Sequence, residues 1–384
     1  WESAQKWKQD KVVNQLTGGV KMLLKKHKID VIQGTAEFID NNTINVEQED
    51  GFQLLQFNDV IISTGSRPIE IPSFPFGGRI IDSTGALSLP EVPKHLIIVG
   101  GGVIGSELGG AYRMLGSKIT IVEGLDHILN GFDKEMSDII ANRVKSAGSE
   151  IFTSAMAKSA TQTDKDVTLT FEVDGKEKTV TGDYLLVSVG RRPNTDLIGL
   201  NNTDVKLTDR GLIEVDDSYA TNVPHIYAIG DVVPGPMLAH KASFQAKVAA
   251  AAIAGAEDDV DLHVALPAVA YTTTELATVG ETPESVKDRK DVKISKFPFA
   301  ANGRAISMND TTGFLRLITE TKEGALIGAQ IVGPGASDLI SGLSLAIENG
   351  LTSKDISLTI QLYLILGEAI MDTAELAYGL PIHV

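Results

Sequence analysis

The amino-acid sequence predicts an α/β fold, and three observations lead to this prediction. First, the apolar run His95–Val99 opens into glycines, and a helical pattern and a second β-rich run, Lys118–Glu123, follow. Second, two further apolar runs, 184–190 and 225–231, end at or next to a glycine, as buried parallel strands do. Third, strands and helices alternate differently after Leu266, which predicts a separate α+β module.

The glycines after Val99 have the spacing Gly-x-Gly-x-x-Gly. We expect Gly100 to permit a tight turn, Gly102 to let a pyrophosphate approach the backbone, and Gly105 to let the helix pack closely on the strand. The pyrophosphate would lie at the helix N-terminus, where free N–H groups and the helix dipole favour an anion. Glycines at this spacing are common in ordinary turns, but here strand, glycines, helix, strand and acid occur in order within one unit. The unit therefore predicts dinucleotide binding.

The acid at the end of the second strand is Glu123. It lies near the position whose carboxylate binds the hydroxyls of an adenosine ribose in such units. A carboxylate there repels a 2′-phosphate, so the sequence favours NAD over NADP.

The composition limits the classes of function. The 384 residues suit two or three domains, 43% of them are hydrophobic, and no apolar run approaches membrane-spanning length. A net charge of −16 argues against binding to nucleic acid or to anionic membrane surfaces. The absence of cysteine removes disulfides, thiolate metal sites and thiol chemistry from these residues, and the seven histidines lack metal-ligand spacing, so no metal site is predicted.

The chain begins at Trp1 rather than at Met. We expect further residues upstream, absent through truncation, cleavage or disorder. No targeting segment is visible in the sequence, and with the composition this predicts a cytoplasmic protein.

Periodicity predicts the individual elements. Apolar residues at three- and four-residue spacing predict an amphipathic helix over 4–27, in which Gly18 and Gly19 are expected to mark a close packing contact. A turn of small residues ends at Pro68, where a domain boundary is expected. The remaining predicted elements are strands at 30–32, 36–38, 43–46, 59–62, 150–153, 184–190, 225–231, 268–271, 315–319 and 328–332, a hairpin over 166–180 with Asp174-Gly175 as its turn, and helices at 133–147, 240–254, 337–348 and 368–377.

A succession of motifs resembles a known family. In order along the chain they are Ser63-Thr64-Gly65, Gly100-x-Gly102-x-x-Gly105, Val189-Gly190-Arg191-Arg192-Pro193-Asn194 and Ala228-Ile229-Gly230-Asp231. This succession resembles the flavin disulfide reductases. The segments Phe297–Ala305, Gly328–Gly333 and Gly379–Val384 look like those of the bacterial dihydrolipoamide dehydrogenases in particular.

The resemblance implies two Rossmann-like dinucleotide-binding domains, the FAD-binding one incomplete, and a C-terminal α+β dimerisation domain. It divides the chain into a remainder of the FAD-binding domain (1–68), an NAD-binding domain (69–195), a central part that completes the FAD-binding domain (196–265) and a dimerisation domain (266–384). The family's first FAD-binding βαβ unit and its Cys-x4-Cys redox disulfide would lie upstream of Trp1.

The resemblance also maps the family's cofactor contacts onto this chain. The FAD contacts correspond to Ala36, Thr64, Gly65, Ser66, Asp231 at the ribityl hydroxyls, and Met237, Leu238, Ala239 and His240 beside the flavin ring. The NAD contacts correspond to Gly100, Gly101, Gly102, Val103, Ile104 and Gly105, to Glu107 near the nicotinamide, Glu123 on the ribose, Ala157 by the adenine, and Gly190.

Competing interpretations exist for some of these residues. Asp231 can serve as a turn cap, and Glu107 can be an exposed helix residue. Arg191 and Arg192 are more often ordinary solvated charges, so we do not include them among the predicted contacts.

The family's catalytic segment has the form His-x-His-Pro-Thr-x-x-Glu, and this chain has Gln361-Leu362-Tyr363-Leu364-Ile365-Leu366-Gly367-Glu368 instead. Glu368 is retained, whereas Tyr363 occupies the place of the acid/base histidine. A phenol with an unperturbed pKa of about 10 does not exchange protons near neutrality as an imidazole does. The five replacements over 361–365 reflect either divergence or an imperfectly read segment.

The resemblance implies oxidation of the dihydrolipoyl group of 2-oxoacid dehydrogenase complexes through a redox disulfide and FAD, with reduction of NAD by a homodimer. Without the cysteine pair, we predict that these residues alone are inactive in that reaction. Another flavin disulfide reductase or an NADH oxidase is one alternative function. A non-catalytic dinucleotide-binding or assembly subunit is an alternative of a different class.

Overall fold

The computed structural model describes residues 1–256 and 264–382. These residues form two compact units, each made of two separate stretches of the chain. The first unit contains Trp1–Ile69 and the described part of the segment that begins at Arg191. The second contains Glu70–Gly190 and the described part of the segment that begins at Val264. The residues expected to contact FAD therefore lie in the first unit, and those expected to contact NAD lie in the second.

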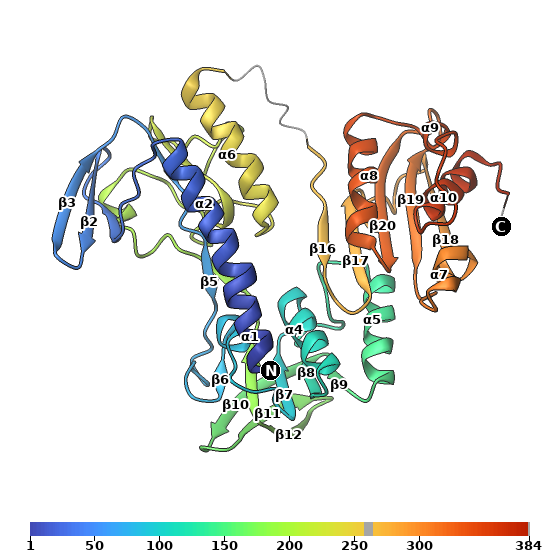
Figure 1. Ribbon diagram of the computed structural model, residues 1–384, viewed down its shortest axis with the longest axis horizontal. Coiled ribbons are helices and arrows are strands. Elements are labelled where there is room, and N and C mark those ends of the chain that lie inside the picture. The colour runs from blue at the N-terminus through green and yellow to red at the C-terminus, as the bar shows by residue number, and fades with distance from the viewer. Residues whose placement is uncertain (257–263, 383–384) are drawn as a thin grey trace. The chain divides into compact units, whose positions relative to one another are not determined.

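A five-stranded parallel sheet, in the order β6-β13-β7-β8-β9, organises the second unit (Figure 1). Leu96 and Ile98 of the central strand point into one core, and Ile97 and Val99 point into another. Because both faces are buried, the strand interiors are nearly continuous in apolar residues instead of alternating, with the buried Thr120 of β8 as an exception. The strands are β6 (Ile80–Ile81), β7 (His95–Val99), β8 (Lys118–Val122), β9 (Glu150–Phe152) and β13 (Tyr184–Val187).

Different layers cover the two faces of this sheet. Helices α3 (Ser83–Leu87), α4 (Val103–Met114) and α5 (Lys134–Ser146) contribute side chains to the core on one face. An antiparallel sheet of β10 (Ala155–Gln162), β11 (Val167–Val173) and β12 (Lys176–Gly182) covers the other. Alternate residues of β11 are buried, as expected for a strand with one covered face.

The C-terminal part of the second unit is built on an antiparallel sheet in the order β16-β17-β20-β19-β18. Its strands are β16 (Ala268–Ala270), β17 (Glu275–Gly280), β18 (Val292–Pro298), β19 (Phe314–Glu320) and β20 (Leu326–Gly333). The accompanying helices are α7 (Gly303–Ser307), α8 (Ala336–Glu348), α9 (Ser353–Ser357) and α10 (Glu368–Tyr378). Side chains of α8 and α10 fill the core between these helices and the sheet.

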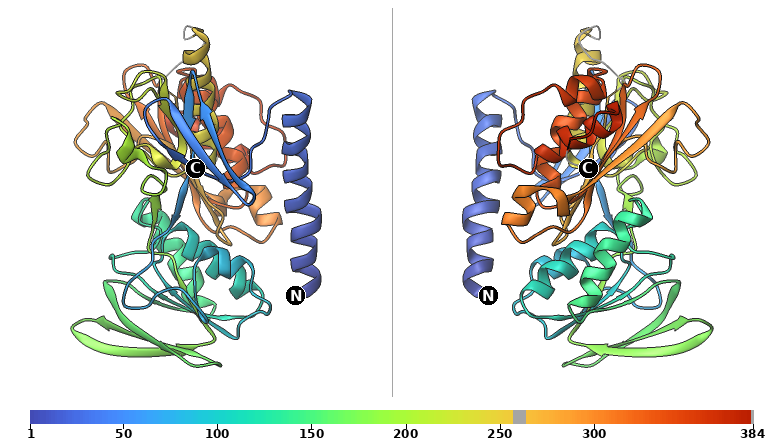
Figure 2. Two further views of the ribbon diagram at one scale, coloured as in Figure 1. Left: turned by 90° about the vertical axis from the view of Figure 1, so that its left-hand side faces the viewer. Right: turned by 90° about the vertical axis from the view of Figure 1, so that its right-hand side faces the viewer.

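The first unit begins with a continuous helix made of α1 (Glu2–Trp7), a π-helical turn (Lys8–Val13) and α2 (Asn14–Lys26) (Figure 2). An antiparallel meander of β1 (Thr35–Phe38), β2 (Thr43–Gln48) and β3 (Gly51–Gln56) follows. Two strand pairs then join distant stretches of the chain: β4 (Val60–Ile62) with β15 (Ile226–Ala228), and β5 (Ser66–Pro68) with β14 (Arg191–Pro193). Helix α6 (Ala239–Ala254) completes the described part of this unit.

The structure confirms the α/β fold class and most of the predicted elements, including the hairpin that turns at Asp174-Gly175. Two expectations are wrong. Residues 30–32 form no strand, because this exposed segment has no partner strand among the described residues. Gly18 and Gly19 mark no close contact, since a Cβ added at either would meet no described atom within 4 Å. The last two residues of the C-terminal motif, 383–384, lie outside the described residues.

Candidate functional site

The three glycines of the turn after β7 have three different environments. Gly100 has φ of +95°, and a Cβ there would lie 2.5 Å from the carbonyl oxygen of Ser188. At Gly105 a Cβ would lie 2.1 Å from the carbonyl oxygen of Gly100, because the helix begins directly against the turn. At Gly102, by contrast, a Cβ would meet no described atom within 4 Å. The turn is therefore closed behind Gly100 and Gly105 and open at Gly102.

Gly102 is also the N-cap of α4, and none of the described side chains caps this helix. The first N–H groups of a helix have no partner within it, so those of the first turn of α4 are available to an anion. This turn contains Val103, Ile104 and Gly105. Open space and N–H groups together fit a phosphate group of a dinucleotide.

Glu123 lies beside the same turn, with 9% of its surface exposed. Its Oε2 accepts a hydrogen bond from the Gly101 amide at 2.6 Å, and its Oε1 accepts one from the Leu125 amide at 2.8 Å. The carboxylate is thus held in place by backbone. Each of its oxygens has a second lone pair that could accept a ribose hydroxyl.

The other residues expected near NAD have simpler surroundings. Glu107 is half-buried on α4, and its Oε1 accepts a hydrogen bond from the Tyr271 amide at 2.7 Å. Burial raises the pKa of this carboxyl, and the Tyr271 bond opposes that effect only in part. The interpretation of Glu107 as an exposed helix residue is therefore wrong. Ala157 is half-buried next to a bulge of β10, and Gly190 has φ of +139° just after β13.

In the first unit, Asp231 is held by Ser66 of β5, which is itself held by Arg191 of β14. Its Oδ2 accepts a hydrogen bond from Ser66 Oγ at 2.6 Å. Arg191 donates in turn to Ser66, from Nε to Oγ at 2.7 Å and from a terminal nitrogen to the carbonyl oxygen at 2.6 Å. Asp231 thus binds to Ser66 of β5. This differs from the competing interpretation, in which Asp231 caps its own turn.

Several residues missed by the sequence analysis fix the turns of this region. Asn194 exchanges hydrogen bonds with Thr64 and donates its amide to the Gly65 carbonyl. Under the Gly230-Asp231 turn, Lys241 donates to the Gly230 carbonyl at 3.1 Å and Gln245 accepts from the Gly230 amide at 2.7 Å.

Burial lowers the pKa of Lys241, whose side chain is largely covered. Arg191 and Asn194 were visible in a motif, but nothing in the sequence shows that their partners come from strand β5 or the turn before it.

The run 237–240 leads into the start of α6, with Met237 and Leu238 half-buried and Ala239 and His240 exposed, and Ala36 is exposed on β1.

The turn at Thr64-Gly65 and the Asp231 carboxylate offer groups that fit a cofactor with a polyol and phosphates. A Cβ at Gly65 would meet no described atom within 4 Å, and φ there is +70°. Asp231 is half-buried and fixed by Ser66, so it can accept hydroxyl groups without first reorienting.

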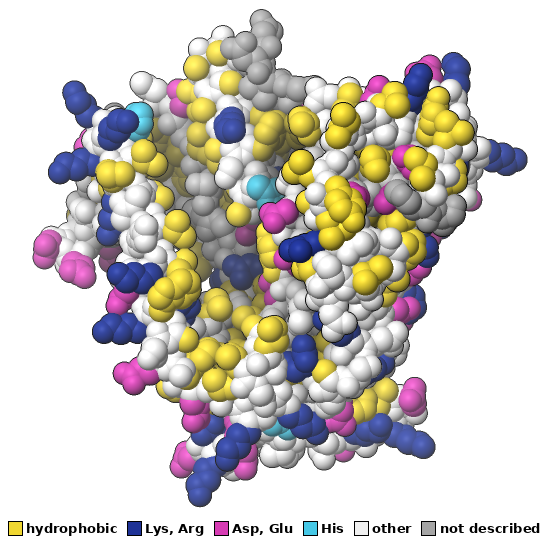
Figure 3. Space-filling view, turned by 45° about the vertical axis from the view of Figure 1, so that its right-hand side comes forward, with side chains coloured by type: hydrophobic (Ala, Val, Ile, Leu, Met, Phe, Trp, Pro, Cys, Tyr) yellow, Lys and Arg dark blue, Asp and Glu magenta, His cyan; other side chains and the backbone are white. Residues whose placement is uncertain are grey.

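The two candidate residues of the altered catalytic segment, Tyr363 and Glu368, are not hydrogen-bonded to each other. Tyr363 is 88% exposed, and its neighbours Leu362 and Ile360 are also exposed. Figure 3 shows where hydrophobic side chains are exposed on one face of the molecule. Glu368 is half-buried, and its Oε2 accepts a hydrogen bond from the Ile365 amide at 2.9 Å. Glu368 therefore holds the backbone of this segment instead of orienting the Tyr363 ring.

Two further features are absent from the described residues. These residues contain no group of three or more His, Asp or Glu side chains placed to hold a metal ion. Among the described helices, none combines the length and the apolar character that a membrane crossing requires.

Comparison with known families identifies two matching segments. Residues 1–246 match the family model described as pyridine nucleotide-disulphide oxidoreductase. Residues 266–374 match the model of the dimerisation domain of the same family.

Individual relatives agree with this result. The chain is 54% identical over 381 residues to the dihydrolipoyl dehydrogenase of Geobacillus stearothermophilus, covering 99% of this chain and 81% of that protein. It is 55% identical over 373 residues to that of Staphylococcus aureus, covering 97% and 80%. Its structure is similar to LpdA from Mycobacterium tuberculosis (TM-score 0.89, 28% identity, 95% of this chain and 81% of that chain). It is also similar to the HOCl-induced flavoprotein disulfide reductase RclA from Escherichia coli (TM-score 0.85, 28% identity, 96% and 84%).

Proposed function

The chain belongs to the pyridine nucleotide-disulphide oxidoreductases and, within them, to the dihydrolipoyl dehydrogenases, and from this premise we propose roles for its residues. The family is one of oxidoreductases that use FAD and NAD, and it has its own dimerisation domain. When bound, the flavin relays electrons and the nicotinamide accepts a hydride. The protein's part is to bind, orient and shield these groups.

We propose that the turn at Gly100–Gly105 binds the pyrophosphate of NAD. The single observation that carries this proposal is the difference among the three glycines, which leaves space at Gly102 alone. N–H groups of the first turn of α4 would donate to the phosphate oxygens, and Glu123 would accept the ribose hydroxyls. Glu107, Ala157 and Gly190 would border the nicotinamide and adenine ends.

For FAD, we propose that Asp231 accepts the ribityl hydroxyls while Ser66, itself held by Arg191, keeps its carboxylate oriented. Two hydrogen bonds from Arg191 to Ser66 support this role, because they fix the position of the Ser66 hydroxyl that donates to Asp231. Thr64 and Gly65 would lie along the same cofactor, as would Ala36 and the run 237–240.

The proton chemistry of the family reaction is not supplied by these residues in its usual form. The 384 residues contain no cysteine, and an exposed phenol stands where the family has an imidazole. We propose that Glu368 retains a structural role through the Ile365 amide, and that these residues by themselves do not oxidise dihydrolipoamide. The same observations favour a second candidate function, a non-catalytic dinucleotide-binding subunit.

We further propose that the protein acts in the cytoplasm as a homodimer joined through the module after residue 266. Its partners would be the dihydrolipoyl domain and the other components of a 2-oxoacid dehydrogenase complex. The family's dimerisation domain, matched over residues 266–374, supports this arrangement.

Equilibrium binding of NADH and NADPH to the 384-residue chain tests the nucleotide site. We expect wild-type protein to bind NADH at least about tenfold more tightly than NADPH, because Glu123 repels the 2′-phosphate. The isosteric change Glu123→Gln keeps an acceptor for the Gly101 amide but removes the charge, so the preference should fall. Equal binding of the two nucleotides by wild type, or no binding of either, would contradict the proposal.

A further inference from the structure

A loop connects the proposed nucleotide site to the start of α5. It runs from Glu123 to Asp133 and lies directly behind the glycine turn. The Leu129 amide donates to the Gly101 carbonyl at 2.8 Å, and a Cβ added at Gly101 would lie 2.6 Å from Ile128 Cγ2. The position of residues 128–129 therefore helps to set the position of the Gly101 peptide.

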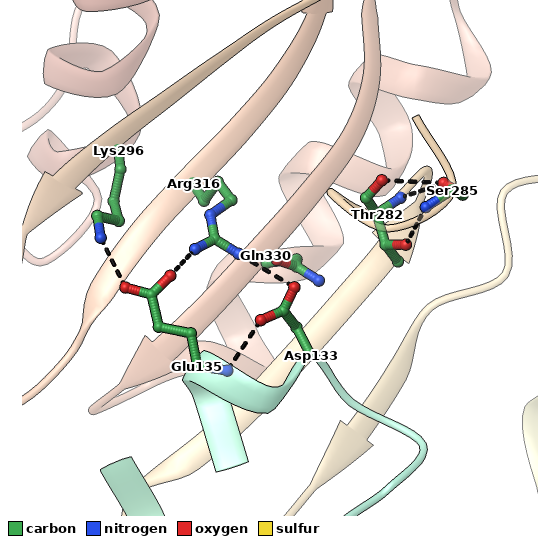
Figure 4. Close-up of polar contacts among 7 residues, drawn as sticks. All are labelled: Asp133, Glu135, Thr282, Ser285, Lys296, Arg316 and Gln330. Atoms are coloured by element: carbon green, nitrogen blue, oxygen red, sulfur yellow. Dashed lines mark hydrogen bonds and ion pairs between the residues drawn. The ribbon is translucent and has the colours of Figure 1, made fainter. Parts of the chain in front are cut away.

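The far end of this loop is held by the antiparallel sheet of the C-terminal module (Figure 4). Arg316 of β19 has a side chain that is 6% exposed, and it forms an ion pair with Glu135 and lies 3.6 Å from Asp133 Oδ2. Gln330 of β20 accepts a second hydrogen bond from Arg316 at 2.5 Å. Lys296 of β18 pairs with the other oxygen of Glu135 at 2.7 Å. We call these five residues the α5 anchor.

Apolar packing supports the α5 anchor. Met136 and Ile140 of α5 belong to the same buried core as Phe314 and Val332 of the sheet. The guanidinium of Arg316 also lies 4.7 Å from the ring centre of Phe314. Charge and packing thus fix the first turns of α5 on the sheet.

Hydrogen bonds lead from the α5 anchor back to the glycine turn. The Asp133 carboxylate accepts a hydrogen bond from the Glu135 amide at 2.9 Å, and the backbone carbonyl of Asp133 accepts one from the Ser137 amide at 3.1 Å. Ser137, which is fully buried, donates from Oγ to the Leu129 carbonyl at 3.3 Å. Leu129 then binds Gly101, whose amide binds Glu123.

We propose that Arg316 is a positioning residue for the nucleotide site, although it lies in the sequence segment assigned to dimerisation. By fixing Asp133 and Glu135, it holds the loop that supports Gly101 and, through it, the Glu123 carboxylate. This inference rests on the proposed NAD site. Removing the guanidinium leaves the two carboxylates without their buried counter-charge, so the start of α5 and its loop relax away from the turn.

The test measures NADH affinity of the 384-residue chain by titration calorimetry. We expect Arg316→Met to raise the dissociation constant by about three- to tenfold, and Arg316→Lys to recover part of the loss. Glu135→Gln changes a side chain that is 45% exposed, so this variant is the one least prone to misfold, and it should raise the constant by about threefold. The matched control is Arg289→Met, because the ion-pair partners of Arg289 are Asp291 and Glu320, which lie in the same module and outside α5.

Amide hydrogen exchange supplies a readout that does not depend on the nucleotide. The Leu129 amide should exchange faster in Arg316→Met and Glu135→Gln than in wild type, while amides in the centre of β7 should keep their protection. Wild-type binding together with unchanged NADH affinity and unchanged Leu129 exchange in both variants would overturn the inference. Failure of wild type to bind NADH would instead overturn the proposed nucleotide site.

Discussion

Two glycine-to-alanine changes in one turn should separate an effect on stability from an effect on nucleotide binding. Gly105→Ala places a methyl group 2.1 Å from the Gly100 carbonyl oxygen, whereas real Cβ atoms essentially never approach another heavy atom closer than 3.0 Å. The helix or the turn must move by about 1 Å, and overpacking of this kind costs about 3 kcal/mol. The melting temperature should therefore fall by about 4 °C, because the unfolding entropy of 384 residues is about 0.8 kcal/mol/K.

Gly102→Ala should leave stability nearly unchanged. Its φ of −66° suits alanine, and its methyl group would meet no described atom within 4 Å. The entropic gain of alanine, about 0.4–1 kcal/mol, is offset by the poorer N-cap, which costs about the same. The methyl group fills the space proposed for the pyrophosphate, so NADH affinity should fall by about tenfold or more.

Thermal melts and NADH titrations of both variants test this reasoning, and Gly342→Ala is the matched control. Gly342 lies on the exposed side of α8 with no described atom within 4 Å of an added Cβ. Alanine there should stabilise the helix by about 0.5–1 kcal/mol and leave NADH binding unchanged. The reasoning is refuted if Gly102→Ala binds NADH like wild type, or if it destabilises the protein as much as Gly105→Ala does.

Two pH-dependent predictions follow from half-buried groups near the parallel sheet. Burial, followed by the charge of Lys118, lowers the pKa of His95 below its ordinary 6.5. Stability should therefore fall as pH drops through 6.5, because the unfolded chain gains a proton there more readily than the folded chain does. In urea melts at pH 7.5 and pH 5.5, His95→Asn should show a smaller loss of stability than wild type. Burial raises the pKa of Glu107 above 4.5, so its stabilising neutral form is lost as pH rises from 4.5. Glu107→Gln, which still accepts the Tyr271 amide, should therefore gain stability over wild type between pH 4 and pH 7, and an equal difference at both pH values would contradict this explanation.

The sequence was most informative where one local pattern determines one element. The mostly apolar runs of β7, β8 and β13 predicted buried parallel strands, because a doubly covered sheet leaves few polar positions in its strands. Strands β3, β10, β17 and β18 were missed, since mixed polar and apolar residues give a weak period-two signal there. Gly18 and Gly19 show the converse error, in which a plausible sequence feature has no packing partner among the described residues.

The candidate site likewise has some features that the sequence predicts and others that it does not. Gly100, Gly102 and Gly105 could be given separate roles from their spacing because each role depends on the local turn. The contacts of Arg191 with Ser66 and of Arg316 with Glu135 could not be predicted, because these pairs are separated by 125 and 181 residues in the sequence. Long-range pairs of this kind leave no periodic trace in a single sequence.

The core that α5 shares with the C-terminal sheet limits how this molecule can be divided. A fragment ending at Gly190 would lose the part of this core that Phe314 and Val332 supply, and the loss would be at most about 1.5–3 kcal/mol for each of Met136 and Ile140, the value for full exposure to water. The part of the chain that holds the proposed nucleotide site therefore depends on the C-terminal sheet for some of its core, despite its self-contained topology. A chimaera that exchanged only this part of the chain would also need apolar side chains on α5 that match those of the C-terminal sheet.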